Sequence, residues 1–137
     1  MNRLLPLLLL SLTLLTAACQ KEEATPVEAP LEGRWTPLST TEYAYSATGA
    51  LTQKTNVPVL PDVYLHITRD SLSYRSTLNN FSLGSFKLVR QGKTLSYGTG
   101  AYCTILELTD HKLVLHYKAQ NVAPGSPYTE PEDVYTR

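Results

Sequence analysis

The feature that most constrains the fold is an alternation of apolar and polar side chains in residues 112–119, KLVLHYKA. Successive side chains of a β-strand point to opposite faces, so a period of two predicts a half-buried strand. One predicted face carries Leu113, Leu115, Tyr117 and Ala119, and the other carries Lys112, Val114, His116 and Lys118.

Further strand-like segments precede this one at intervals of roughly 8–12 residues, which is typical of an antiparallel barrel or sandwich. No long stretch shows helical spacing. The turn Asp110-His111 joins residues 112–119 to YCTILELT, which predicts a tight hairpin. The predicted inner faces carry Tyr102, Thr104, Leu106 and Leu108 in YCTILELT, Val63, Leu65 and Ile67 in VYLHIT, and Leu72 and Tyr74 in SLSYRST. The segments FSLGSFKLVR and TLSYGTG, separated by a turn at Gly92, are two further predicted strands.

The two ends of this region are less regular. Tyr43 and Tyr45 alternate toward a turn at Gly49, which predicts a pair of strands. Pro37 would interrupt a central ladder, so we expect the first strand to be an edge strand bent at this residue. Residues 57–62 are predicted to form a connection and residues 120–131 a long loop, followed by a short last strand over residues 133–137.

Residues 31–35, LEGRW, resemble the L-x-G-x-W opening of the bacterial lipocalin-like domains. The resemblance implies a small antiparallel up-and-down β-barrel of about eight strands over residues 31–137. In such barrels the tryptophan of the first strand plugs the closed end, and an arginine ending the last strand lies across it. Here Gly33, Trp35 and Arg137 of the final DVYTR would close the barrel, with the guanidinium over the indole face.

The first 18 residues are predicted to be a signal peptide. Arg3 precedes a leucine-rich core that is shorter than the roughly 20 residues of a membrane span. Thr16-Ala17-Ala18-Cys19 resembles the bacterial lipobox, which implies acylation of Cys19. The alternatives are a plain secretory signal cut after Ala18 and a buried N-terminal helix. Residues 19–30 are polar and contain proline, which predicts a flexible tether between a membrane anchor and the domain.

Cys19-Gln20-Lys21-Glu22-Glu23 resembles the export signal of surface lipoproteins in some Gram-negative bacteria. No aspartate follows the cysteine, so the familiar inner-membrane retention signal is absent. We therefore expect a lipid-anchored protein of the bacterial outer membrane, with display on the cell surface as a further hypothesis. An ordinary solvated linker is the other interpretation of this charged run.

Several classes of function find no support in the sequence. The 12 basic and 12 acidic residues balance, so no nucleic-acid partner is expected. No metal site is expected, because His66 and His116 fall on outward faces and His111 in a turn. Cys103 lies in an apolar strand, which predicts a buried, inert thiol. The glycines of YGTG and the acids of EPED favour a strand bend and a solvated loop, so no catalytic residue and no cofactor is predicted.

Tyrosine is the one compositional excess, with nine residues against two phenylalanines and one tryptophan. Tyrosine suits strands in general, but it also lines amphipathic cavities. The predicted ligand cavity comprises Leu65, Ile67, Tyr74, Phe86, Tyr102, Leu106, Leu115 and Tyr117. Two functions remain: an envelope protein that holds a small apolar or amphipathic ligand, or an interaction or inhibitor module with a filled barrel and an envelope-protein partner.

Overall fold

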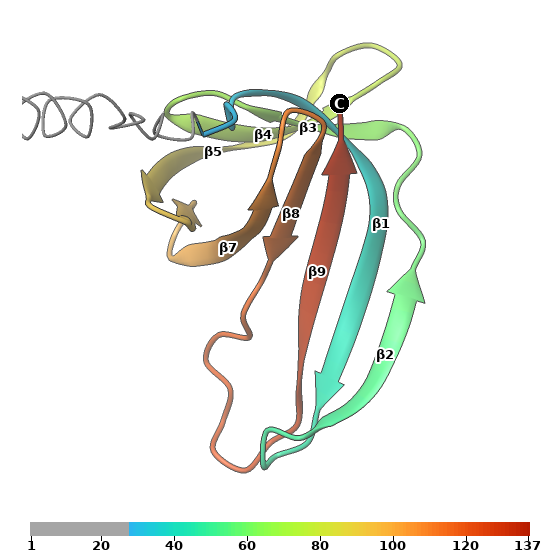
Figure 1. The fold of residues 1–137 in the computed structure, drawn as a ribbon, viewed down its shortest axis with the longest axis vertical. Helices are drawn as coiled ribbons and strands as arrows, with labels where there is room; N and C mark the ends of the chain where they lie inside the picture. Colours follow the sequence, from blue (N-terminus) through green and yellow to red (C-terminus); the bar gives the residue numbers. More distant parts are fainter. Residues whose placement is uncertain (1–27) are drawn as a thin grey trace, which may run out of the picture.

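The computed structural model describes residues 28–137, which form β-strands connected by turns and loops (Figure 1). The predicted signal peptide, the predicted lipidation site Cys19 and most of the predicted tether lie outside the described residues. No helix capable of crossing a membrane occurs within residues 28–137. The strands are β1 (Gly33–Tyr45), β2 (Leu51–Val57), β3 (Val63–Ile67), β4 (Ser71–Ser76), β5 (Ser82–Gln91), β6 (Thr94–Tyr97), β7 (Ala101–Leu108), β8 (Lys112–His116) and β9 (Tyr128–Thr136).

Eight of these strands close into a ring. The strand order is β2-β1-β3-β4-β5-β6-β7-β8-β9, and β9 returns to pair with β1. Every pairing is antiparallel, and β2 pairs with β1 alone. The ring therefore consists of β1 and β3 to β9, which confirms the prediction of an antiparallel barrel of about eight strands. The return of β9 to β1 distinguishes a barrel from the sandwich that the strand spacing alone also allowed.

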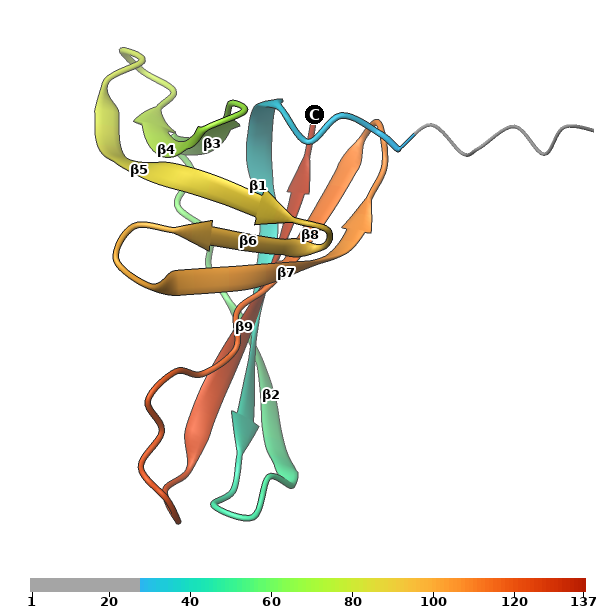
Figure 2. The same cartoon turned by 90° about the vertical axis from the view of Figure 1, so that its left-hand side faces the viewer.

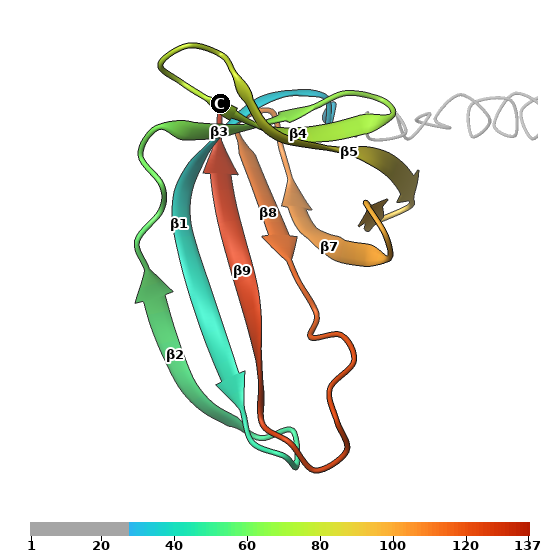
Figure 3. The ribbon, with the colours of Figure 1, turned by 180° about the vertical axis from the view of Figure 1, so that it is seen from behind.

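The barrel continues at one side into a long ribbon, which we call the arm (residues 40–57 and 128–133). Here β1 pairs with β2 from Thr40 to Tyr45 and with β9 as far as Tyr128. Figure 2 shows β5, β6 and β7 crossing in front of β1 and β9, with the arm extending below them. Seen from behind, β2, β1, β9 and β8 lie side by side (Figure 3). The arm thus extends the wall of the barrel beyond its interior.

The hydrophobic core lies inside the barrel and draws on all eight strands of the ring. Its largest fully buried side chains are Trp35, Leu65, Ile67, Leu72, Leu95, Leu113, Leu115 and Cys103. Leu65 and Ile67 of β3 and Leu72 of β4 occupy inward positions that the alternation predicts. Leu113 and Leu115 of β8 do so as well. Burying one such side chain stabilises the fold by about 1.5–3 kcal/mol.

The prediction that the first strand is an edge strand is wrong, because β1 pairs on both sides. The pairing with β3 ends at Trp35, and the pairing with β2 begins only at Thr40. Pro37 lies between these two segments, beside a bulge that leaves Leu38 exposed. A proline in a central strand is tolerated where one side has no ladder to complete.

The last strand is longer than predicted. β9 begins at Tyr128, so Glu130 and Glu132 lie on a strand and not in a solvated loop, and Asp133, the predicted first residue of this strand, lies well inside it. Pro131 lacks a donor, but its carbonyl accepts a hydrogen bond from the Tyr117 amide at 2.9 Å. The nine residues of β9 form their ladder with β1, a partner far away in the sequence, which local proline and acid content does not reveal.

Candidate ligand-binding site

One end of the barrel, which we call the closed end, is covered by Trp35 and Arg137. The indole is fully buried, and its Nε1 donates a hydrogen bond to the Leu31 carbonyl at 2.8 Å. The Arg137 guanidinium lies over the ring, with Cζ 4.1 Å from a ring centroid. A cation–π contact extends to about 6 Å from the ring centroid, so this separation is well within it. The expected contact between Arg137 and Trp35 is therefore present.

Arg137 also forms hydrogen bonds with the segment before β1. Its Nε donates to the Asp110 carbonyl at 2.7 Å, and its two Nη atoms donate to the carbonyls of Glu32 at 3.0 Å and Pro30 at 2.9 Å. Gly33 has a φ of 133°, and a Cβ at this position would lie 3.3 Å from the arginine. A glycine at position 33 therefore serves both the backbone conformation and the close approach.

Six of the eight predicted cavity residues are on the inner face. Leu65, Ile67 and Leu115 are buried, and Tyr74 and Tyr117 are partly buried against the core. Phe86 lies opposite Leu72 across β4 and β5 and makes an edge contact with Tyr97, with 38% of its surface exposed. It therefore lies at the rim of the interior.

The other two predicted cavity residues, Tyr102 and Leu106, point outward. They are 36% and 49% exposed, whereas Cys103 and Ile105 are buried. A bulge between Ile105 and Glu107 inserts Leu106 as an extra residue, so that Leu108 still faces the core. An alternation read through this bulge assigns residues 102–106 to the wrong face.

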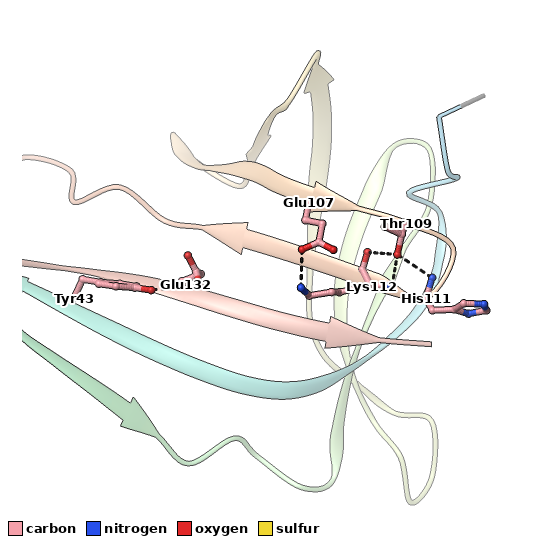
Figure 4. Close-up of polar contacts among 6 residues, drawn as sticks. All are labelled: Tyr43, Glu107, Thr109, His111, Lys112 and Glu132. Atoms are coloured by element: carbon pink, nitrogen blue, oxygen red, sulfur yellow. Dashed lines mark hydrogen bonds and ion pairs between the residues drawn. The ribbon is translucent and has the colours of Figure 1, made fainter. Parts of the chain in front are cut away.

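Leu106 instead faces an outer groove with Tyr43, Tyr45, His116 and Glu132. The Tyr43 hydroxyl and the Glu132 carboxylate approach each other there at 3.5 Å. Figure 4 shows these two side chains at the left of the view, away from the β7–β8 turn at the right. Nearer that turn, Lys112 Nζ lies 2.6 Å from Glu107 Oε2. The exposed Lys112–Glu107 pair contributes at most about 1 kcal/mol.

A cavity of about 180 Å³ opens beside the core. Tyr74, Asp133 and Tyr135 line its polar side, and Val63 and Leu65 line its apolar side. The connection over residues 58–60 forms its rim, where Leu60 is 69% exposed. The full lining is Pro37, Ser39, Thr40, Pro58, Val59, Leu60, Val63, Leu65, Tyr74, Asp133 and Tyr135.

Asp133 is the one carboxylate of this lining. Its Oδ1 accepts a hydrogen bond from the Thr40 hydroxyl at 2.6 Å, and its Oδ2 accepts one from the Tyr135 hydroxyl at 3.0 Å. The sequence analysis does not single out Asp133, because it treats the acids of EPED as a solvated cluster although Asp133 begins the predicted last strand. The available signal was the alternation in DVYTR, which puts Asp133 and Tyr135 on one face.

Burial raises the pKa values of several interior groups. Desolvation is the largest cause for Tyr97, Tyr117 and Tyr135, and the Asp133 charge adds to it in each case. These hydroxyls therefore stay protonated at neutral pH and can donate or accept hydrogen bonds. Desolvation, with a smaller effect of Asp133, raises the pKa of Cys103 to about 12. The thiol is buried and free, and it stays protonated at neutral pH.

The histidines are dispersed over the outer surface and turns. His116 Nε2 lies 2.9 Å from Glu130 Oε2, while His66 lies on β3 and His111 in the β7–β8 turn. Within residues 28–137, no three or more His, Cys, Asp or Glu side chains gather in a group able to hold a metal ion.

Comparisons with known proteins add one structural neighbour. No family model matches this chain, and no curated protein matches its sequence. Among solved structures, the chain is similar to a lipocalin-like protein from Bacteroides uniformis, with 15% sequence identity and a TM-score of 0.46. The match covers 78% of this chain and 97% of that chain. The barrel assignment for the present chain rests on its own strand pairing.

Proposed function

We propose that this protein is a lipid-anchored, non-enzymatic binding protein of the bacterial envelope that holds a small apolar or amphipathic ligand in its barrel. The observation that carries the proposal is the cavity of about 180 Å³ between Leu65, Tyr74 and Asp133. An engineered apolar cavity of about 150 Å³ holds benzene, so this space, which is open to solvent, suits a ligand or ligand group of that order.

The direct test is mass spectrometry of small molecules that co-purify with the chain from a bacterial envelope. The proposal expects a compound with an apolar body about the size of a benzene ring, released on unfolding. A Val63→Trp variant, which would fill the cavity, is the matched control. Recovery of the same compound from both forms would contradict binding in the barrel.

The anchor in this proposal is Cys19, supported by the lipobox resemblance. The described chain approaches the barrel at its closed end, because Arg137 binds the carbonyls of Pro30 and Glu32. Asp133 precedes Arg137 by four residues, which is about 13 Å along a strand. A tether to the outer membrane would therefore meet the barrel at the end away from the cavity mouth.

Acylation is tested with radiolabelled palmitate. Wild type should take up label, while Cys19→Ser should remain unlabelled and soluble in the periplasm. Equal labelling of the two forms would contradict the anchor.

Surface display is tested by adding protease to intact cells. The wild type should be cleaved, and replacing Lys21, Glu22 and Glu23 by alanine should leave the protein membrane-bound but protected. If added protease does not cleave the wild type on intact cells, the display hypothesis is wrong and these residues are only a linker.

A second candidate function is an interaction module. The β4–β5 hairpin exposes Leu78, Phe81 and Leu83, with 79%, 65% and 57% of their surfaces accessible. Adjacent exposed apolar side chains of this kind are typical of contact surfaces for other proteins. Crosslinking in intact envelopes through a photoreactive residue at position 81 tests this candidate, and a crosslinked partner that is lost with Leu78→Ser would support it.

A further inference from the structure

The charge of the cavity is unbalanced. Asp133 is its only ionisable carboxylate, and no lysine, arginine or histidine is among the residues that line it. Within residues 28–137, the ion pairs involve Arg90, Lys112 and His116, and none of them includes Asp133. The cavity therefore presents a negative charge without a protein cation beside it.

The carboxylate is oriented but not saturated. Thr40 and Tyr135 each donate one hydrogen bond to it, one to each oxygen. A carboxylate offers about four lone-pair sites, so each oxygen retains acceptor capacity toward the cavity. These two hydroxyls fix the side-chain position, which lowers the cost of ordering it when a ligand binds.

The remaining walls suit an apolar body. Val63, Leu65 and Pro37 provide aliphatic surface, and the rings of Tyr74 and Tyr135 provide aromatic surface. A cation near tyrosine rings gains from their quadrupoles, whereas an anion beside Asp133 is repelled. The lining thus discriminates between ligands of equal size by charge.

We infer that the barrel selects a small primary amine, with its ammonium group bound to Asp133 and its apolar body against Val63 and Leu65. This inference rests on the proposed ligand-binding function and specifies its ligand class. Anions such as free fatty acids are disfavoured by the same charge, and the cavity has room for an apolar body about the size of a benzene ring.

The test compares three probes of nearly equal size: benzylamine, benzyl alcohol and benzoate. Each is titrated at pH 7 by calorimetry into the full chain in its soluble Cys19→Ser form. Benzylamine should bind about tenfold or more tightly than benzyl alcohol, since a hydrogen bond to a charged group is worth about that factor, and benzoate should bind weakest. Methyl NMR shifts of Val63 and Leu65 should report the binding.

The variants test whether Asp133 is the cause. Asp133→Asn should reduce benzylamine affinity to that of benzyl alcohol and leave benzyl alcohol unchanged. Glu132→Gln removes the same charge from the adjacent, outward position of β9 and should change neither affinity. Circular dichroism establishes that each variant is folded, and the preference of the wild type among the three probes tests the inference without any variant.

The outcomes separate the inference from the function on which it rests. Equal binding of benzylamine and benzyl alcohol, or an unchanged amine preference in folded Asp133→Asn, would overturn amine selection and leave a neutral-ligand barrel. Failure of all three probes to bind, with no methyl shift at Val63 or Leu65, would overturn both the amine inference and the proposed binding function.

Discussion

At the scale of single residues, the closed end depends on two side chains of unequal weight. Trp35 is fully buried and hydrogen-bonded to Leu31, so its stabilisation comes from apolar burial in the interior. Arg137 is exposed to solvent and contributes a ring contact and hydrogen bonds to backbone carbonyls. Water can replace most of those hydrogen bonds, so the arginine contributes less than the tryptophan.

We predict that Trp35→Ala lowers the free energy of unfolding by about 3–5 kcal/mol, a large part of the roughly 5–15 kcal/mol that holds a domain together. Arg137→Ala should cost about 0.5–2 kcal/mol. Urea denaturation followed by circular dichroism measures both, because Trp35 is the chain's one tryptophan and fluorescence would be lost with it. Arg137→Lys, which keeps the charge but not the planar fork, should recover only part of the loss. Equal costs for the two alanine variants would contradict this division.

At the scale of elements, strand faces follow the alternation only where a strand is uninterrupted. β3, β4 and β8 contain no bulge within the segments that the alternation assigned inward, and Leu65, Leu72 and Leu113 are buried as predicted. β7 contains a bulge after Ile105 that returns Leu108 to the core, so an alternation that places Leu108 inward assigns Leu106 to the wrong face. Bulges depend on the partner strand, so a single segment of sequence does not reveal them.

The same limit explains which parts of the site could be predicted. Tyr74 lies in β4 and Tyr117 directly follows β8, and both pack against the core as the alternation predicts. Asp133 was missed because β9 pairs with β1, and that pairing turns an acid- and proline-rich segment into part of the barrel wall. The resemblance at residues 31–35 predicts the contact of Trp35 with Arg137 because barrels of that family bring these two positions together, which local periodicity does not reveal.

A pair of neighbouring substitutions tests the face assignment of β7. Ile105→Ala should lower the free energy of unfolding by about 2–5 kcal/mol, because it empties space in the core. Leu106→Ala should change it by about 0.5 kcal/mol or less, because that side chain is half exposed. The midpoints of urea denaturation measure both. A larger loss for Leu106→Ala than for Ile105→Ala would show that β7 has the opposite register.

At the scale of the whole molecule, the closed barrel holds several acidic protons in one interior. Cys103, Tyr97, Tyr117 and Tyr135 all have raised pKa values, with burial as the largest cause. A raised pKa in the folded state means that the unfolded chain loses the proton first. The stabilisation is therefore complete below the unfolded pKa and declines as the pH rises toward the folded one.

We predict that stability falls steeply at alkaline pH. The Cys103 thiol lowers the stability between its ordinary pKa of 9.0 and its folded-state pKa of about 12. The buried tyrosines add to this loss of stability above their ordinary pKa of 10.0. Each group contributes a slope of about 1.4 kcal/mol per pH unit within its window. Urea denaturation between pH 7 and 11 measures the slope. Cys103→Ala should be less stable at pH 7 but lose stability more slowly above pH 9, and identical slopes would contradict a buried titrating thiol.

The bonds from Arg137 to Pro30 and Glu32 have a mechanical consequence. A protein tethered through the segment before residue 28 carries tension whenever its domain is pulled by flow or by a bound molecule. That tension would act on the carbonyls of Pro30 and Glu32, which accept hydrogen bonds from Arg137, so it would be transmitted to β9 as well as to β1. Because β1 is paired with β3 at its start and with β9 along the arm, such a pull is shared between two ladders from the first residues of the strand onward.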